Sequence, residues 1–91
     1  MRKGMRERRG SVRKKEYGMA LLVPNSAKAD CVAGLLIEAN DRGFRVKHSY
    51  SGFRRNHVVR FIHRLREGAA RVVWTRAANL EFETGFEYLD D

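Results

Sequence analysis

The stretch RRNHVVRFIHRLRE, residues 54–67, decides the fold that the sequence predicts. Its apolar residues Val58, Phe61, Ile62 and Leu65 are spaced i, i+3, i+4 and i+7. A helix places residues with this spacing on one face, whereas a half-buried strand alternates apolar and polar residues. We therefore predict a helix over residues 54–67 whose apolar face packs on the core.

The remainder of this predicted helix is strongly basic. His57, Arg60 and Arg64 would form its outward row, with further arginines beside them. An arginine-rich helical face can bind successive phosphates of a nucleic acid, and it equally fits an acidic patch on another protein. The candidate nucleic-acid-binding residues of this segment are Arg54, Arg55, His57, Arg60, Arg64 and Arg66. No helix-turn-helix, zinc-finger or aromatic RNA-binding signature accompanies them, so ordinary solvated surface is the competing interpretation.

A second basic segment lies at the N-terminus. Residues 1–18 hold eight Lys or Arg and two Glu, so they contribute +6 to a formal net charge of +8. Their apolar content is too low to offset the entropy of ordering the chain, and we predict a disordered basic arm. This arm adds a second set of candidate nucleic-acid-binding residues, Arg8, Arg9, Arg13, Lys14 and Lys15.

Met19 begins the first segment with a fold-forming pattern. The residues Lys14, Lys15 and Glu16 could be encoded by a purine-rich stretch that resembles a ribosome-binding site just upstream of a start codon. We therefore hypothesise that the native product starts at Met19 and that residues 1–18 are a translated leader. The alternative is that the arm is native and contributes to binding.

Residues 19–51 predict a strand–helix–strand unit. Met19–Val23 is a continuous apolar run, typical of a strand covered on both faces, and Phe44–Ser51 alternates apolar and polar residues. Residues 27–42 combine a capping signal with an apolar pattern wider than one helical stripe. The two strands should then be parallel, joined by a right-handed crossover. A helix this apolar would be covered on two sides or would form a homodimer through residues 27–42.

The C-terminal part predicts a hairpin. Residues 71–75 are rich in β-branched and aromatic residues, and residues 80–88 alternate without error. The inward side chains would be Leu80, Phe82, Phe86 and Tyr88. The predicted order is β-α-β-α-β-β, which makes residues 19–91 a single mixed α/β domain. Two helices would pack on a small mixed sheet of roughly four strands.

Catalytic and metal-binding patterns are weak. His57 and His63 are six residues apart and so do not form an i, i+4 ligand pair on a helix. His48, Tyr50 and His57 are a nuclease-like combination, but no carboxylate or nucleophile is placed to support it. We predict no catalytic activity, no metal and no cofactor.

Cys31 is the single cysteine, so no intrachain disulfide is predicted. We expect a buried structural thiol in a reducing, cytoplasmic compartment. The uncharged apolar run at residues 18–23 is far shorter than the ~20 residues that a membrane-spanning helix needs. A membrane partner is therefore not predicted.

The predicted function is non-catalytic binding of nucleic acid through the basic arm and the outer face of helix 54–67. DNA and RNA are not distinguished by these features. The alternative is a small protein-binding regulator or inhibitor, of the kind encoded by a phage or mobile element, that acts on a host protein complex. Small size and a net charge of only +2 beyond residue 18 motivate this alternative.

Overall fold

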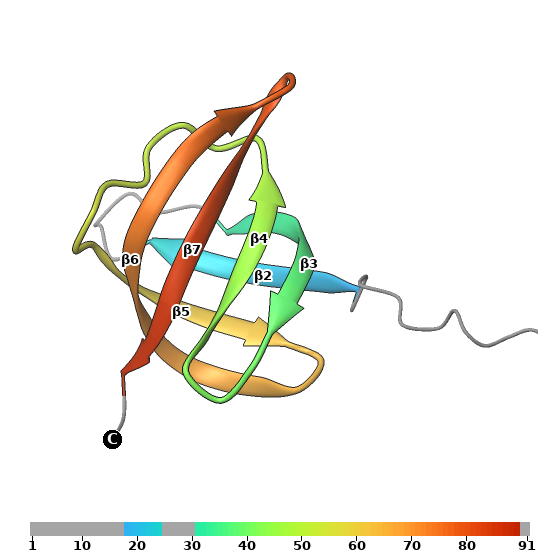
Figure 1. Cartoon of the computed structure of the whole chain (residues 1–91). Coiled ribbons are helices and arrows are strands. Elements are labelled where there is room, and N and C mark those ends of the chain that lie inside the picture. The colour runs from blue at the N-terminus through green and yellow to red at the C-terminus, as the bar shows by residue number, and fades with distance from the viewer. Residues whose placement is uncertain (1–17, 25–30, 90–91) are drawn as a thin grey trace, which may run out of the picture.

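The structure is a computed structural model that describes residues 18–24 and 31–89. These residues form six antiparallel strands that close into a barrel in the order β2-β3-β4-β7-β6-β5 (Figure 1). The strands are β2 Met19–Pro24, β3 Val32–Ala39, β4 Gly43–His48, β5 Val58–His63, β6 Arg66–Ala78 and β7 Glu81–Leu89. The long β6–β7 hairpin projects beyond the barrel at its tip (Figure 1). No helix in the described part of the chain is long and apolar enough to cross a membrane.

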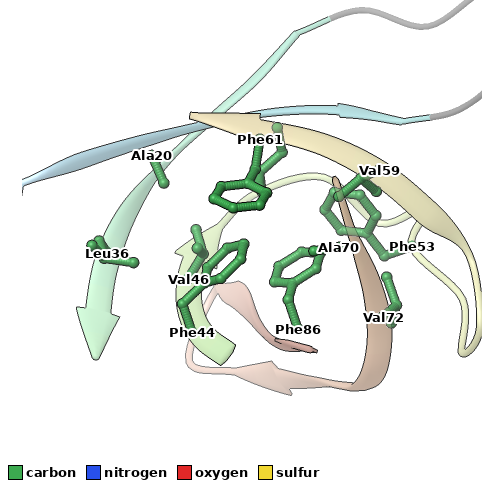
Figure 2. Packing of buried hydrophobic residues seen from close by; sticks show 11 residues of the cluster. Ala20, Leu36, Phe44, Val46, Phe53, Val59, Phe61, Ala70, Val72 and Phe86 are labelled. Carbon is green, nitrogen blue, oxygen red and sulfur yellow. The ribbon is translucent and has the colours of Figure 1, made fainter. Parts of the chain in front are cut away.

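The barrel interior is filled by apolar side chains from all six strands and from one loop (Figure 2). Phe44 lies at its centre, with its ring centroid 4.7 Å from that of Phe61 and 4.8 Å from that of Phe86. Phe53 enters from the loop between β4 and β5 and contacts His48 edge-on. Such aromatic contacts add roughly 0.5–1.5 kcal/mol each beyond the burial of area.

The predicted mixed α/β fold is wrong, because every described element is a strand and every strand pair is antiparallel. The parallel pairing expected for the strands at residues 19–23 and 44–51 is also wrong. Strand β2 pairs with β3 and β5, whereas β4 pairs with β3 and β7. Antiparallel neighbours need only short connections, so no crossover helix is required between them.

Residues 54–67 are not a helix but a loop, strand β5, a turn and the start of β6. Side chains alternate along β5 between the barrel interior and the outside. Those inside are Val59, Phe61 and His63, and those outside are Val58, Arg60 and Ile62. Of the four side chains predicted to reach the core, Phe61 is 2% exposed, but Ile62 is 53% and Leu65 60% exposed.

The helical spacing in residues 58–65 was misleading for a physical reason. Two outward positions of β5 carry apolar side chains, and one inward position carries a histidine. His63 is tolerated inside because its ring nitrogens are hydrogen-bonded, to the Tyr88 hydroxyl at 3.1 Å and to the Leu65 amide at 3.2 Å. An apolar outer face and a polar inner residue together remove the period-2 signal.

The helix predicted over residues 27–42 is likewise wrong where the structure describes it. Residues 32–39 form β3, and the register with β4 shifts between Leu36 and Glu38. Ordinary strand alternation already places Leu35 outside and Leu36 inside, and the bulge interrupts this alternation at Ile37. Apolar residues on both faces imitate a helix that is apolar all round. The homodimer predicted through that helix is therefore wrong as well.

Other predictions are confirmed at the level of single strands. Strands occur at residues 19–24, 43–48 and 81–89, and Phe44, Val46 and His48 point inward as expected. The strand at residues 19–24 was predicted to be covered on both faces, which is wrong, because Met19, Leu21 and Val23 are exposed. The β6–β7 hairpin is present, although β6 continues through the residues predicted to form the connection, as far as Ala78. Leu80 was predicted to reach the core, but it lies in the turn and is almost fully exposed.

Candidate functional site

The basic row predicted on helix 54–67 is dispersed in the barrel. Arg60 lies on the outer side of β5, and Arg64 lies in the turn that follows this strand. His57 lies in the loop before β5, where its Nδ1 accepts a hydrogen bond from the amide of Arg54 at 3.3 Å. Because β5 has six residues, about 20 Å separates its two ends. The predicted row therefore does not form one continuous surface.

Arg66 lies on strand β6 and lines the same hollow as Arg60. Its guanidinium carbon lies 3.8 Å from the centre of the ring of Tyr88, which is on strand β7. Arg54 and Arg55 are exposed in the loop before β5. The predicted arm residues Arg8, Arg9, Arg13, Lys14 and Lys15 lie outside the described residues.

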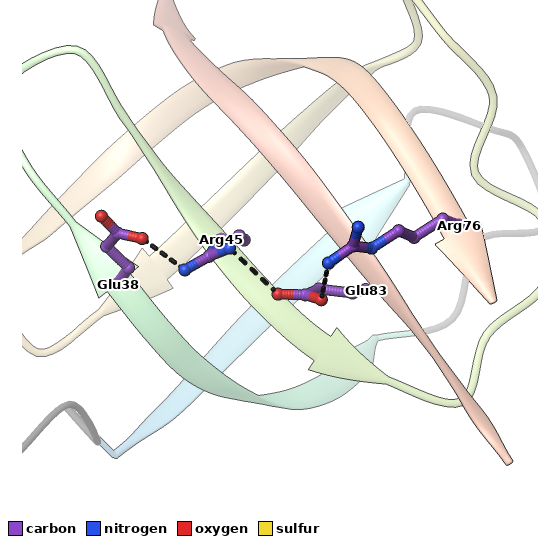
Figure 3. Close-up of polar contacts among 4 residues, drawn as sticks. All are labelled: Glu38, Arg45, Arg76 and Glu83. Carbon is purple, nitrogen blue, oxygen red and sulfur yellow. Dashed lines mark hydrogen bonds and ion pairs between the residues drawn. The ribbon is translucent and has the colours of Figure 1, made fainter. Parts of the chain in front are cut away.

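Strands β3, β4, β7 and β6 carry charged side chains that pair across their outer face (Figure 3). The guanidinium of Arg45 contacts the carboxylate of Glu38, and its other terminal nitrogen lies 3.4 Å from Glu83. The second oxygen of Glu83 accepts a hydrogen bond from Arg76 at 3.0 Å. Arg45 on β4 and Glu83 on β7 therefore lie on neighbouring strands and pair across them.

A hollow of about 490 Å³ opens in this face. It forms where two outward positions, Gly43 and Gly85, carry no side chain. A Cβ atom at Gly43 would stand 2.0 Å from the carbonyl oxygen of Phe86, and one at Gly85 would stand 2.5 Å from the Trp74 indole. Both glycines are thus required by the close approach of their neighbours. We call this hollow the Trp74 groove. Its polar and aromatic lining consists of Glu38, Asn40, Arg42, Phe44, Arg45, Trp74, Phe86 and Glu87.

Trp74 lies flat against the backbone of the groove. The register pairs Arg45 with Gly85 and Gly85 with Trp74, so these three positions lie in one row across β4, β7 and β6. The guanidinium carbon of Arg76 lies 5.4 Å from the centre of the indole ring. The indole is therefore held in one orientation while part of it stays exposed to solvent.

The turn between β3 and β4 forms one rim of the groove. The Asn40 side-chain oxygen accepts hydrogen bonds from the amides of Arg42 at 2.8 Å and Gly43 at 3.1 Å. The amide of Asn40 also donates to the carbonyl of Gly43 at 2.9 Å. These bonds fix the turn and hold the backbone of Arg42 beside the groove.

The histidines do not form a reactive site. His48 is buried, its Nε2 is 2.7 Å from the Thr84 hydroxyl, and its Nδ1 accepts a hydrogen bond from the Tyr50 amide. Burial lowers the pKa of His48, although the charge of Glu81 opposes this shift. His57 is exposed in the loop before β5, and its side chain is hydrogen-bonded to the amide of Arg54 rather than to His48 or Tyr50. Among the described residues, no group of His, Cys, Asp or Glu has the arrangement of a metal site.

The prediction of a buried thiol at Cys31 is wrong, because Cys31 lies just before β3 and is exposed.

The sequence interpretation also missed the Trp74 groove. The local signals for it were the two glycines, Gly43 and Gly85. Neither glycine can be assigned to a groove until the register brings it beside Trp74.

The comparisons with known proteins give no relatives for this fold or this groove. No protein-family model matches the chain, and no curated protein and no solved structure is significantly similar to it.

Proposed function

We propose that this protein is a non-catalytic binding protein for single-stranded nucleic acid, and that one base enters the Trp74 groove. The observation that carries this proposal is the indole held against Gly85 at the side of a hollow of about 490 Å³. A fixed aromatic ring beside a groove is the usual platform on which unpaired bases stack. We place this activity in the cytoplasm, because a single cysteine fits a reducing compartment.

The charges around the groove suit a base better than a phosphate. Arg45 is paired with two carboxylates, and Glu87 contacts Arg71, so this part of the face is close to neutral. Such a rim offers both hydrogen-bond donors and acceptors, which is what the edge of a nucleobase needs. An isolated phosphate would gain little here, because the neighbouring carboxylates would repel it.

The phosphates would instead contact cations outside this paired set. Arg42 lies at the rim of the groove and forms no ion pair with a described residue. The described residues carry ten Lys or Arg and six Asp or Glu, and three of the cations are used in ion pairs with Glu38, Glu83 and Glu87. The exposed arginines of the loops would add to the attraction, as would the N-terminal residues if they are native.

A stacking assay tests the proposal directly. Fluorescence anisotropy would compare a short labelled single strand, the same sequence as a duplex, and mononucleotides as competitors. Trp74→Ala should weaken binding of the single strand by about 5- to 150-fold, the range that corresponds to removal of one stacked base. Gly85→Ala should also weaken it, because the new methyl group would displace the indole.

Leu80→Ala is the matched control, since this exposed apolar residue lies at the hairpin tip, away from the groove lining. Its affinity should equal that of the wild type. Equal affinity of Trp74→Ala and wild type, or duplex binding as tight as single-strand binding, would contradict the proposal. If mononucleotides competed as well as the oligonucleotide, we would conclude that the ligand is a free nucleotide and not a nucleic acid.

A further inference from the structure

The outer face of β3, β2 and β5 is apolar and lies on a different part of the barrel from the Trp74 groove. Its central apolar side chains are Met19, Leu21 and Val23 on β2, Ala33 and Leu35 on β3, and Ile62 on β5. All six are exposed, Met19 by 58%. We call this set of six residues the β2 face.

The strand register makes the β2 face continuous. Leu21 pairs with Ala33 on one side and with Ile62 on the other. Met19 pairs with Leu35 in the next row. Directly opposite residues in an antiparallel pair lie about 4.5–5.5 Å apart, so these side chains touch one another. A contiguous apolar surface of this kind marks an interaction site more often than isolated exposed residues do.

A small depression of about 170 Å³ lies within this surface. Leu21, Val23 and Ile62 contribute to its walls, and Phe61 and Gly68 also line it. Gly68 lies opposite Phe61 in the register, and a Cβ atom there would stand 3.7 Å from the nearest carbon of the Phe61 ring. A depression of this size suits one apolar side chain of a partner, as anchor pockets in protein interfaces do.

The charges around the β2 face are mainly positive. Arg60 borders the depression and pairs in register with Val23. Lys47 pairs in register with Leu35, and Arg64 follows β5 in the turn. Glu67, opposite Ile62, is the one acid among the described residues that lines the depression. None of the three cations forms an ion pair with another described residue.

We infer that the β2 face docks an acidic amphipathic segment of another protein, with one apolar side chain in the depression and a carboxylate on Arg60. Charge complementarity selects this occupant, since the apolar surface is bordered by Arg60, Lys47 and Arg64. In a contact between two copies of the chain, these cations would face one another, and each copy carries a net charge of +8, so the two copies would repel each other. A lipid surface presents no single side chain that could fill the depression.

A random peptide library displayed on phage, selected on the full chain, tests this inference. Enriched peptides should combine apolar residues with Asp or Glu. Synthetic copies should bind Ile62→Glu and Arg60→Glu at least about tenfold more weakly than wild type, as for anchor contacts. Trp74→Ala is the control and should bind them unchanged, which separates this site from the nucleic-acid site. Arg60→Glu replaces only an exposed charge, so it remains informative if Ile62→Glu fails to fold.

Three results would overturn the inference. The first is a selection whose peptides bind the two variants as tightly as wild type. The second is binding to vesicles of phosphatidylcholine and phosphatidylglycerol that Ile62→Glu abolishes while no peptide depends on Ile62. The third is a dimer in light scattering that Ile62→Glu converts to a monomer, which would assign the face to a second copy.

Discussion

His48 and His63 show how single polar residues are accommodated inside this barrel. In each ring Nδ1 accepts a hydrogen bond from the backbone amide two residues later. Nε2 must then carry the proton of the neutral form, and it faces a hydroxyl group, that of Thr84 or of Tyr88. Thr84 in turn is 2.7 Å from the hydroxyl of Thr75. Protonation of Nδ1 would break the backbone bond and leave a buried charge.

The stability of the protein should therefore decrease in mild acid. Burial lowers the pKa of both His48 and His63, and the charge of Arg66 lowers that of His63 further. The unfolded chain, with histidine pKa values near about 6.5, then binds protons that the folded chain does not, so stability falls as the pH drops below this value. Thermal unfolding followed from about pH 8 to about pH 5 measures the effect.

Two variants give this measurement its controls. His63→Phe should reduce the slope of the unfolding free energy against pH by up to about 1.4 kcal/mol per pH unit, the contribution of one bound proton. Leu80→Ala should leave it unchanged, because this exposed residue has no titratable group. If the variant at His63 kept the full pH dependence, the buried rings would not be its cause.

At the scale of the elements, the outer face of β4, β7 and β6 is organised by carboxylates of unequal burial. Glu83 pairs with both Arg45 and Arg76, and its side chain is only 13% exposed. Glu87 contacts Arg71 alone and is 47% exposed. A shielded carboxylate shared by two cations should contribute more than an exposed pair, because solvent screens the exposed one.

Replacement of the two glutamates should reveal this difference. Glu83→Gln should lower the free energy of unfolding by about 1–3 kcal/mol, since two guanidinium groups lose their shared partner. Glu87→Gln should cost less, about 0–1 kcal/mol. Urea denaturation of both variants at low and high salt is the measurement. Equal losses of stability would mean that the chain of ion pairs does not act as a network.

For the whole molecule, the positive charge and the Trp74 groove should make separate contributions to nucleic-acid binding. The full chain carries +8, and residues 1–18 contribute +6 of this. Cations that contact phosphates release counterions, whereas a stacked base does not. Net charge should thus govern the salt dependence of binding, and the Trp74 groove should govern the preference for single strands.

A variant with Arg8, Arg9, Arg13, Lys14 and Lys15 replaced by glutamine tests this separation. If the arm binds phosphates of a single strand, the slope of log K against log salt should become shallower by about 0.7 for each phosphate that the variant no longer neutralises. The fold-change in affinity caused by Trp74→Ala should be the same in this background as in the wild type. An unchanged salt slope would remove the arm from the binding surface.

Several features of the fold and the site follow from local patterns, and others do not. Residues 43–48 and 81–89 alternate with mostly apolar residues inward and mostly charged residues outward, so their strands can be predicted from the sequence although His48 and Thr84 face inward. Residues 58–63 are not, because Val58 and Ile62 face outward and His63 faces inward. The basic residues of segment 54–67 are identifiable as charged surface, but their common face depended on a helix that does not form.

The sequence alone determined the single cysteine, the excess of positive charge at the N-terminus and the strands with regular alternation. The tertiary structure decided that residues 32–39 and 58–63 are strands and that Gly43, Gly85 and Trp74 enclose a groove. The physical reason is that a strand is stabilised by partners distant in the sequence. Where both faces of a segment are apolar, only the pairing of the closed barrel chooses between helix and strand.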